Sequence, residues 1–395
     1  APCPLLEVNE MKKAFVIWFL GCFTLFAQPF QIGRTTLNLF DASRNRTIAT
    51  EVFYPADTNG TDVPITVSSS QTFPLLSFGH GFVMTFEAYQ NFWEELVPQG
   101  YIMAFPKTEG SFSPSHTNFA KDLAFVIEAM NGLNNQSNSL FFSRISSKNA
   151  VMGHSMGGGC ALLAKQYSTQ INHLVTFAAA ETNPSAISAS STIDLPSFTI
   201  AGLNDCVTPP ATNQLPMYNS LQSSCKNYLG ITGASHCQMA DFNFFCSVGD
   251  GTCSPSPTIT RDEQHEIIFS YLNLWLDYYL KENCVSGELF EALKTTDNEN
   301  VTNSNCQLCE NLSLANSTLT IPFNVTPNPF KEVITLKSDT ETPFEYSLFD
   351  LKANKILEGK AINEIQLETS FLSSGIYFLT VIQQQQKKTV RLIKH

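Results

Sequence analysis

The sequence predicts an α/β protein with a doubly wound, mostly parallel sheet, followed by a small all-β sandwich. Two observations carry this prediction. From about residue 31 to 280, short apolar runs alternate with stretches of helical spacing, the pattern of a parallel sheet covered by helices on both faces. From about residue 325 onward, short alternating segments are separated by turns and show no helical spacing, which is typical of a sandwich.

The elements of the first region follow from its apolar runs and turn residues. Residues 35–55 predict two strands around a polar turn. Further strands are expected over 73–78, 101–106, 150–155, 173–179, 196–202 and 227–231, and helices over 118–133, 156–168 and 261–280.

The first residues predict a secretory leader. After an upstream decapeptide, Lys12 and Lys13 precede an apolar run from Ala14 to Ala27, and cleavage is expected after Ala27. A membrane anchor is the alternative, but the run is short and polar chain follows it. The predicted segments are upstream residues and leader over 1–27, an α/β catalytic domain over 28–295, an Asn-, Ser- and Thr-rich linker over 296–324 and the β domain over 325–395.

Composition narrows the possible functions. The net charge of −12 argues against a nucleic-acid partner, which would require a basic surface. Nine cysteines remain after the leader, and in an exported protein they predict a disulfide framework with at least one unpaired thiol. A zinc site at Cys306 and Cys309 is the alternative, but neither a second such pair nor a nearby histidine completes it. Cys160, within a predicted helix, is expected to be a buried, small apolar residue.

A candidate nucleophile, Ser155, lies in the stretch Gly153-His154-Ser155-Met156-Gly157. The stretch fits the pattern Gly-x-Ser-x-Gly, which holds a serine on a sharp turn between a strand and a helix. The two glycines allow the close backbone approach that such a turn requires, and the following helix points its positive end at the reacting atoms. A tight turn without catalytic function is the alternative.

A nucleophilic serine needs a base and an acid that orients the base. Of the histidines that follow with an acid before them, His236 is in a loop after a predicted strand, whereas His265 lies within a predicted helix. Asp205 also follows a strand, at the carboxyl edge where catalytic groups gather in such sheets. Asp205 and His236 are therefore preferred. Asp194 precedes its strand, Glu181 follows a strand closer to the serine, and an Asx turn is the alternative role for Asp205.

Two backbone N–H groups should stabilise the oxyanion that forms when a serine attacks an ester. Met156, directly after the serine, supplies one. The loop after the early strand 73–78 supplies the other, from Phe82, with Gly81 allowing close approach. His80 is expected to shape this loop.

These motifs together resemble the α/β-hydrolase fold, and within it the cutinase-like polyester hydrolases, including PET hydrolases, and the related dienelactone hydrolases. The resemblance spans about residues 33–284. It implies a serine ester hydrolase without a cofactor or metal, in which Phe82 and Met156 also contact the acyl group. PET hydrolases carry a tryptophan after the strand that follows the nucleophile helix, and here Ser185 or a neighbour stands in its place. The resemblance also implies a disulfide near the site. A Cys206–Cys237 bridge would supply it, although Cys225 could compete for either partner. Cys246 and Cys253 are expected to close a local loop. Cys284 is expected to pair with Cys306 or Cys309.

The C-terminal stretch resembles the sorting domain of the type IX secretion system of Bacteroidetes, through "TPNPF", "YSLFD", "SGIYFLTV" and a basic end. This resemblance implies export by that machinery to the cell surface or medium. A carbohydrate-binding sandwich is the alternative.

The sequence thus predicts a secreted, monomeric serine hydrolase of polyesters or other medium-chain esters, bound in a shallow groove that includes Gly81, Phe82, Met156 and Ser185. A small-ester or lipid esterase is the closest alternative. A peptidase and a binding module on a disused hydrolase scaffold are further alternatives, and a complete Ser, His and Asp set argues against the second.

Overall fold

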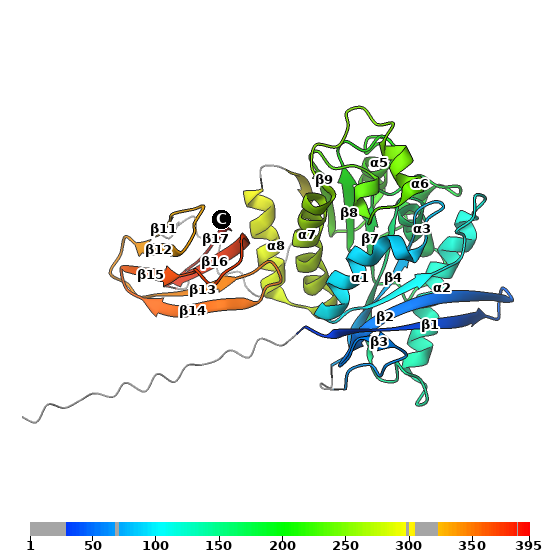
Figure 1. Cartoon of the computed structure of the whole chain (residues 1–395), viewed down its shortest axis with the longest axis horizontal. Helices are drawn as coiled ribbons and strands as arrows, with labels where there is room; N and C mark the ends of the chain where they lie inside the picture. Colours follow the sequence, from blue (N-terminus) through cyan, green and yellow to red (C-terminus); the bar gives the residue numbers. More distant parts are fainter. Residues whose placement is uncertain (1–28, 68–70, 298–299, 305–322, 385) are drawn as a thin grey trace, which may run out of the picture.

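A ten-stranded sheet forms the centre of the larger domain. The computed structural model describes residues 29–67, 71–297, 300–304, 323–384 and 386–395 (Figure 1). The strand order is β10-β9-β8-β7-β6-β4-β5-β2-β1-β3, and the pairs from β5 to β9 are all parallel. This confirms the predicted fold class. The strands are β1 Gln31–Asp41, β2 Arg46–Ala56, β3 Gly60–Thr61, β4 Phe73–Gly79, β5 Ile102–Pro106, β6 Ile145–His154, β7 His173–Phe177, β8 Ser197–Gly202, β9 Lys226–Ile231 and β10 Asn300–Ser304.

Helices bury both faces of this sheet. One hydrophobic cluster joins the strands to α2 His116–Asn134, α3 Met156–Ala164, α4 Ala186–Ser190 and α5 Gln214–Ser220. A second cluster, on the other face, contains α1 Gln90–Leu96, α7 Arg261–Lys281 and α8 Cys284–Thr296. Such two-sided coverage explains why the central strands are almost continuously apolar. A short helix, α6 Phe244–Asp250, contributes no residue to the buried core.

Local signals fix where the long helices begin. Thr260 caps α7, because its side chain accepts a hydrogen bond from the N–H of Glu263 while the Glu263 carboxylate accepts one from the N–H of Thr260. Ser115 caps α2 by accepting from the N–H of Asn118. The remaining helical turns are the short 3-10 segments Phe86–Tyr89, Val97–Gln99 and Cys237–Met239.

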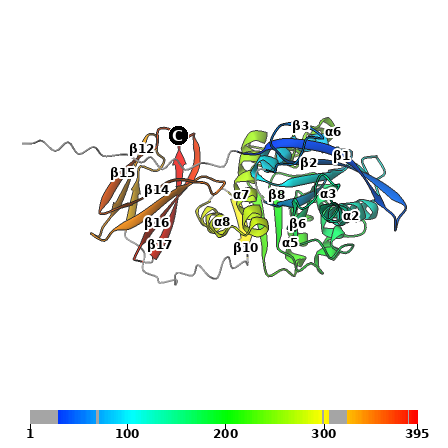
Figure 2. The same ribbon diagram turned by 90° about the horizontal axis from the view of Figure 1, so that it is seen from below.

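The smaller domain is a two-sheet sandwich, as the sequence predicts. One sheet has the order β11-β12-β15 and the other β14-β13-β16-β17, and Figure 2 shows the two sheets side by side. A separate apolar cluster fills the space between them. The strands are β11 Phe323–Thr326, β12 Val333–Ser338, β13 Phe344–Phe349, β14 Lys355–Ala361, β15 Glu364–Glu368, β16 Gly375–Gln383 and β17 Gln386–Lys394.

The two domains are in contact along α8 (Figure 1). Phe349 and Phe378 of the sandwich join the apolar cluster of α7 and α8. Lys387 of β17 forms an ion pair with Glu288 of α8, and Lys352 forms another with Glu95, 2.9 Å away.

Two elements differ from the sequence prediction. Helix α8 was not expected, and β10 lies within the stretch predicted as a linker, where it pairs with β9 as an antiparallel edge strand. An edge strand needs no alternating apolar residues, so its polar sequence, Asn-Val-Thr-Asn-Ser, gave no strand signal. The predicted leader and residues 305–322 lie outside the described residues. No helix in the described ranges is long and apolar enough to cross a membrane.

Candidate active site

Ser155 occupies the sharp turn between β6 and α3. Its φ of 56° and ψ of −121° lie in a region that residues other than glycine rarely adopt. The turn depends on its glycines: a Cβ on Gly153 would lie 2.3 Å from the carbonyl oxygen of Gly157, and one on Gly157 would lie 2.1 Å from that of Gly79. The strained turn projects the serine hydroxyl beyond the carboxyl edge of the sheet.

The structure brings Ser155, His236 and Asp205 into one hydrogen-bonded chain. The Oγ of Ser155 lies 2.9 Å from Nε2 of His236, and Nδ1 of His236 lies 2.8 Å from Oδ2 of Asp205. The aspartate faces Nδ1, so this nitrogen carries the proton and Nε2 is left to accept one from the serine. All three side chains are at least nine-tenths buried, which excludes water from competing for these bonds.

Thr208 contacts both Asp205 and His236 and so fixes their relative position. Its N–H donates to Oδ1 of Asp205 at 2.8 Å, and its hydroxyl lies 2.8 Å from Oδ2 of Asp205 and 3.0 Å from Nδ1 of His236. Gln214 supports this arrangement by donating to the Thr208 hydroxyl and, at 2.6 Å, to the carbonyl of Ala179. Asp205 therefore accepts a local bond from the backbone N–H three residues on, and it also contacts His236. Thr208 was missed at the sequence level.

The loop after β4 places Phe82 beside the serine turn. Residues 81–84 form a tight turn in which the N–H of Met84 donates to the carbonyl of Gly81. Val83, a β-branched residue, has a φ of 54°, so this turn is also strained. Within the described part of the chain, the N–H groups of Phe82 and Met156 donate no hydrogen bond that would occupy them. An oxyanion contact of these two N–H groups stays a prediction.

A buried network joins this loop to the histidine loop. Gly81 donates its N–H to the hydroxyl of Tyr89 at 2.7 Å, and that hydroxyl lies 3.0 Å from Nδ1 of His154. Nε2 of His154 lies 3.1 Å from the carbonyl oxygen of His236. A carbonyl can only accept, so Nε2 donates, Nδ1 accepts, and the tyrosine hydroxyl donates to it. Burial, and then the nearby His236, hold the pKa of His154 well below its usual value, so its ring stays neutral.

The His154 and Tyr89 pair was also missed at the sequence level. His154 stands at the variable position of the serine motif, and Tyr89 lies in a short helical turn far from it in sequence. Only the fold brings them together.

His80 bridges two loops rather than facing the serine. Its ring nitrogens lie 2.8 Å from the carbonyl oxygen of Gly81 and 2.9 Å from that of Thr108. Burial lowers the pKa of His80 despite these contacts. Its geometry is that of a residue that shapes the loop.

The weighed alternatives lie elsewhere. Nε2 of His265, on α7, is 3.1 Å from the amide of Asn91, and Asp194 is exposed before β8. Glu181 is exposed and accepts from the N–H of Ile187. Ser185 caps α4 by accepting from Ser188, so a substrate contact at Ser185 stays a prediction.

The predicted disulfide pairing is wrong. Cys206 bonds to Cys253 and Cys237 to Cys246, instead of Cys206 to Cys237 and Cys246 to Cys253. The reason is α6, which folds back over the histidine loop and brings its own cysteine to Cys237. Both bridges therefore tie the α6 segment to a residue that directly follows Asp205 or His236.

The other cysteines complete the comparison. Cys160 is a free thiol with no exposed surface, as predicted, and burial raises its pKa. Cys225 and Cys284 are disulfide-bonded as well, and Cys225 therefore competes for neither Cys206 nor Cys237. Cys306 and Cys309 lie outside the described residues.

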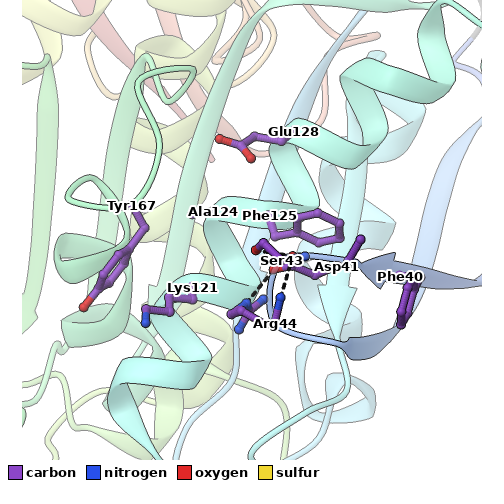
Figure 3. Close-up of a pocket in the computed structure, with 10 residues that line it drawn as sticks. Phe40, Asp41, Ser43, Arg44, Lys121, Ala124, Phe125, Glu128 and Tyr167 are labelled. Atoms are coloured by element: carbon purple, nitrogen blue, oxygen red, sulfur yellow. Dashed lines mark hydrogen bonds and ion pairs between the residues drawn. The ribbon is translucent and has the colours of Figure 1, made fainter.

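A separate hollow of about 570 Å³ lies between the β1–β2 turn and α2 (Figure 3). Its lining includes Phe40, Arg44 and Tyr167, but none of Ser155, Asp205 and His236. Figure 3 shows the Asp41 carboxylate bonded to neighbouring groups at this hollow. Over the residues that the structure covers, no group of three or more His, Cys, Asp or Glu is placed to hold a metal ion.

Comparison with known proteins finds two families. Residues 27–247 match the model of the PET hydrolase-like family, and residues 324–395 match that of the secretion system C-terminal sorting domain. The second match confirms the predicted type IX sorting domain, which marks the protein for export to the cell surface or medium.

The similar curated proteins are bacterial cutinases. Cutinase 1 of Thermobifida cellulosilytica and a cutinase of Thermobifida fusca are each 37% identical over 110 residues, which is 27% of this chain and 40% or 35% of theirs. Cutinase 2 of Thermobifida cellulosilytica is 26% identical over 187 residues, 47% of this chain and 64% of that protein. The chain thus spans less than two thirds of each relative. The first family model covers more than half of this chain, and the protein therefore belongs to the PET hydrolase-like family.

Proposed function

We propose that this protein is a secreted serine ester hydrolase that cleaves polyester bonds through an acyl-enzyme. The observation that carries the proposal is the buried chain from Ser155 through His236 to Asp205, with contacts of 2.9 and 2.8 Å. Similarity to cutinases supports the polyester substrate.

The arrangement accounts for both halves of the reaction. Ser155 Oγ attacks the ester carbonyl carbon while its proton passes to Nε2 of His236. The imidazolium that forms is stabilised by Asp205, and it then gives its proton to the leaving alcohol. Water, deprotonated by the same nitrogen, attacks the acyl-serine and releases the acid.

The developing negative charge needs a matching site. The N–H groups of Phe82 and Met156 would each donate to the carbonyl oxygen as it becomes tetrahedral, and removal of one such donor typically costs about 10²–10³-fold in rate. The N-terminal end of α3 adds a positive partial charge at the same place. The side chains of Phe82 and Met156, with Gly81, would border the acyl group.

The sorting domain supports a role outside the cell and an interaction with the type IX secretion machinery. A polymeric ester would meet the protein there. No residue of the mechanism requires a cofactor.

The test compares product release from an amorphous aromatic polyester film with hydrolysis of p-nitrophenyl butyrate, using wild type and Ser155→Ala. Wild type should hydrolyse both, and the variant should lose at least about 10⁴-fold on the short ester. A fluorophosphonate should add one phosphonyl group to wild type, at Ser155. Activity on the short ester alone would favour the small-ester esterase, and labelling elsewhere or an active variant would refute the serine assignment.

A further inference from the structure

Strand β16 of the sandwich is buried on both of its faces. Tyr377, Leu379 and Val381 belong to the apolar cluster between the two sheets. Successive side chains of a strand point to opposite faces, so Phe378 lies on the outer face of its sheet, and yet it has no exposed surface. The outer face of a sandwich sheet is usually polar and meets water. Another part of the protein therefore covers the outer face of this sheet.

The register of the sheet shows which residues share this outer face. Phe349 of β13 pairs with Phe378 on one side, and Arg391 of β17 pairs with it on the other. Paired residues of neighbouring strands point the same way, so these three side chains form one patch, which we call the docking face. Phe349 and Phe378 belong to the same apolar cluster as Phe290 and Leu293 of α8. Figure 2 shows α8 next to this sheet, and the contacts join it to β17.

Ion pairs lie around the apolar contact. Lys387 of β17 pairs with Glu288 of α8, and Lys352 of the sandwich pairs with Glu95 of α1 at 2.9 Å. The four side chains are between 24% and 44% exposed, so they form a rim that water still reaches. An apolar, desolvated centre with a polar rim is the anatomy of an interface between two proteins.

The charges on the two sides of the contact are complementary. Arg391 donates to the carbonyl of Thr296 at 3.3 Å, at the C-terminal end of α8, where the helix carbonyls attract a cation. The sandwich thus contributes cations, and the larger domain contributes carboxylates and a helix end. The composition agrees, because residues 323–395 hold nine Lys or Arg and eight Asp or Glu, whereas the rest of the chain holds 14 and 27. Such complementarity favours one partner and one orientation.

We propose that the sandwich binds the larger domain as a separate subunit would, through the docking face, and stays attached to it when the chain between the two is cut. The partner that the docking face fits is the apolar and acidic surface of α8 and α1. This inference goes beyond the sorting role of the sandwich, and it is independent of the proposed hydrolysis, so neither proposal depends on the other.

The first test cuts the full chain between the two domains. A recognition sequence for a site-specific protease is inserted between Ala315 and Asn316. No cysteine follows Cys309, so no disulfide can join the two pieces after the cut. The pieces should elute together in size-exclusion chromatography at about 10 µM, because an interface with this apolar centre should have a dissociation constant of about 1 µM or less. Elution of the two pieces as separate peaks would overturn the proposal.

The second test asks whether the docking face and its rim make the association. Lys352→Glu combined with Lys387→Glu places like charges across both ion pairs. The dissociation constant of the cut protein, measured by sedimentation of a dilution series, should rise at least about 10-fold. Lys337→Glu with Lys360→Glu is the matched control, because these lysines form ion pairs within the sandwich and are 61% and 76% exposed. The control should change the dissociation constant by less than about twofold.

A charge exchange separates a lost contact from a misfolded variant. Lys387→Glu combined with Glu288→Lys restores opposite charges, so the dissociation constant should return to within about threefold of that of the unsubstituted cut protein. Circular dichroism verifies that each variant folds. A double reversal that weakens the association no more than the control does would overturn the proposal. An exchanged pair that binds no better than Lys387→Glu alone would overturn it as well.

Discussion

Tyr89→Phe should damage the site although Tyr89 does not touch the reacting atoms. The substitution keeps the ring and removes one oxygen. That oxygen accepts from the N–H of Gly81 at 2.7 Å and lies 3.0 Å from Nδ1 of His154, and the tyrosine has no exposed surface. Two buried polar groups therefore lose their partner at once.

The expected magnitude follows from those two contacts. A buried group left without a partner costs about 1–3 kcal/mol, so the free energy of unfolding should fall by about 2–4 kcal/mol. Gly81 is the residue directly before Phe82, and Nε2 of His154 donates to the carbonyl oxygen of His236. Small displacements of both loops should lower kcat/KM on p-nitrophenyl butyrate by about 10-fold, mainly through kcat.

The assay pairs urea unfolding with steady-state kinetics, and Tyr101→Phe serves as the control. Tyr101 is equally buried, and its hydroxyl donates to Asp277 at 2.6 Å, with no contact to the site. The control should lose stability and keep its kcat/KM. A Tyr89→Phe enzyme with wild-type kcat/KM, or one in which kcat/KM falls no more than in the control, would refute the positioning role. Since His154 stays neutral, the loss should be the same from neutral to alkaline pH.

Three further predictions concern stability. Burial lowers the pKa of His173 from 6.5 to about 4, so below pH 6.5 the unfolded state binds a proton that the folded state does not. The free energy of unfolding should therefore fall by about 3 kcal/mol as the pH drops from 6.5 to 4. Denaturant titrations should show that the stability of a His173→Gln protein depends less steeply on pH, and an equal pH dependence would contradict this. Gly157→Ala should lower the free energy of unfolding by about 3 kcal/mol or more and abolish activity, because its Cβ would lie 2.1 Å from a backbone oxygen. Gly132→Ala, on a helix where the added Cβ meets nothing within 4 Å, should instead raise the melting temperature slightly. Replacing Cys206 and Cys253 together by serine opens a loop of 47 residues and should cost about 4 kcal/mol; calorimetry that shows no change would indicate that the segment is held by other contacts.

Much of the fold was readable because its signals are local. A few consecutive residues are enough to predict the apolar strand Phe73–Gly79 and the capped helix Arg261–Lys281. The positions of Ser155, Asp205 and His236 followed from chain order and from their place after strands, and the structure brings these three together. Local sequence patterns and the alternation of strands and helices were sufficient to predict these elements and these three residues.

The rest depends on contacts between distant segments. Nothing local in the sequence indicates that Tyr89 reaches His154, or that Phe112 meets Phe245. The disulfides illustrate the same limit, since four cysteines allow three pairings and the spacing does not choose among them. Once α6 is in place, the Cα atoms of Cys206 and Cys253 lie 5.3 Å apart and those of Cys237 and Cys246 lie 5.5 Å apart, as disulfides require.

The two bridges beside Asp205 and His236 also have a consequence for when the protein matures. Thiols stay reduced in the cytosol, and the sorting domain sends this chain out of it. The α6 segment is therefore untethered during synthesis and can be fastened only after the chain has left the cytosol. A protein assembled in this order acquires its finished surface outside the compartment that makes it, and it remains incomplete among the esters of the cytosol.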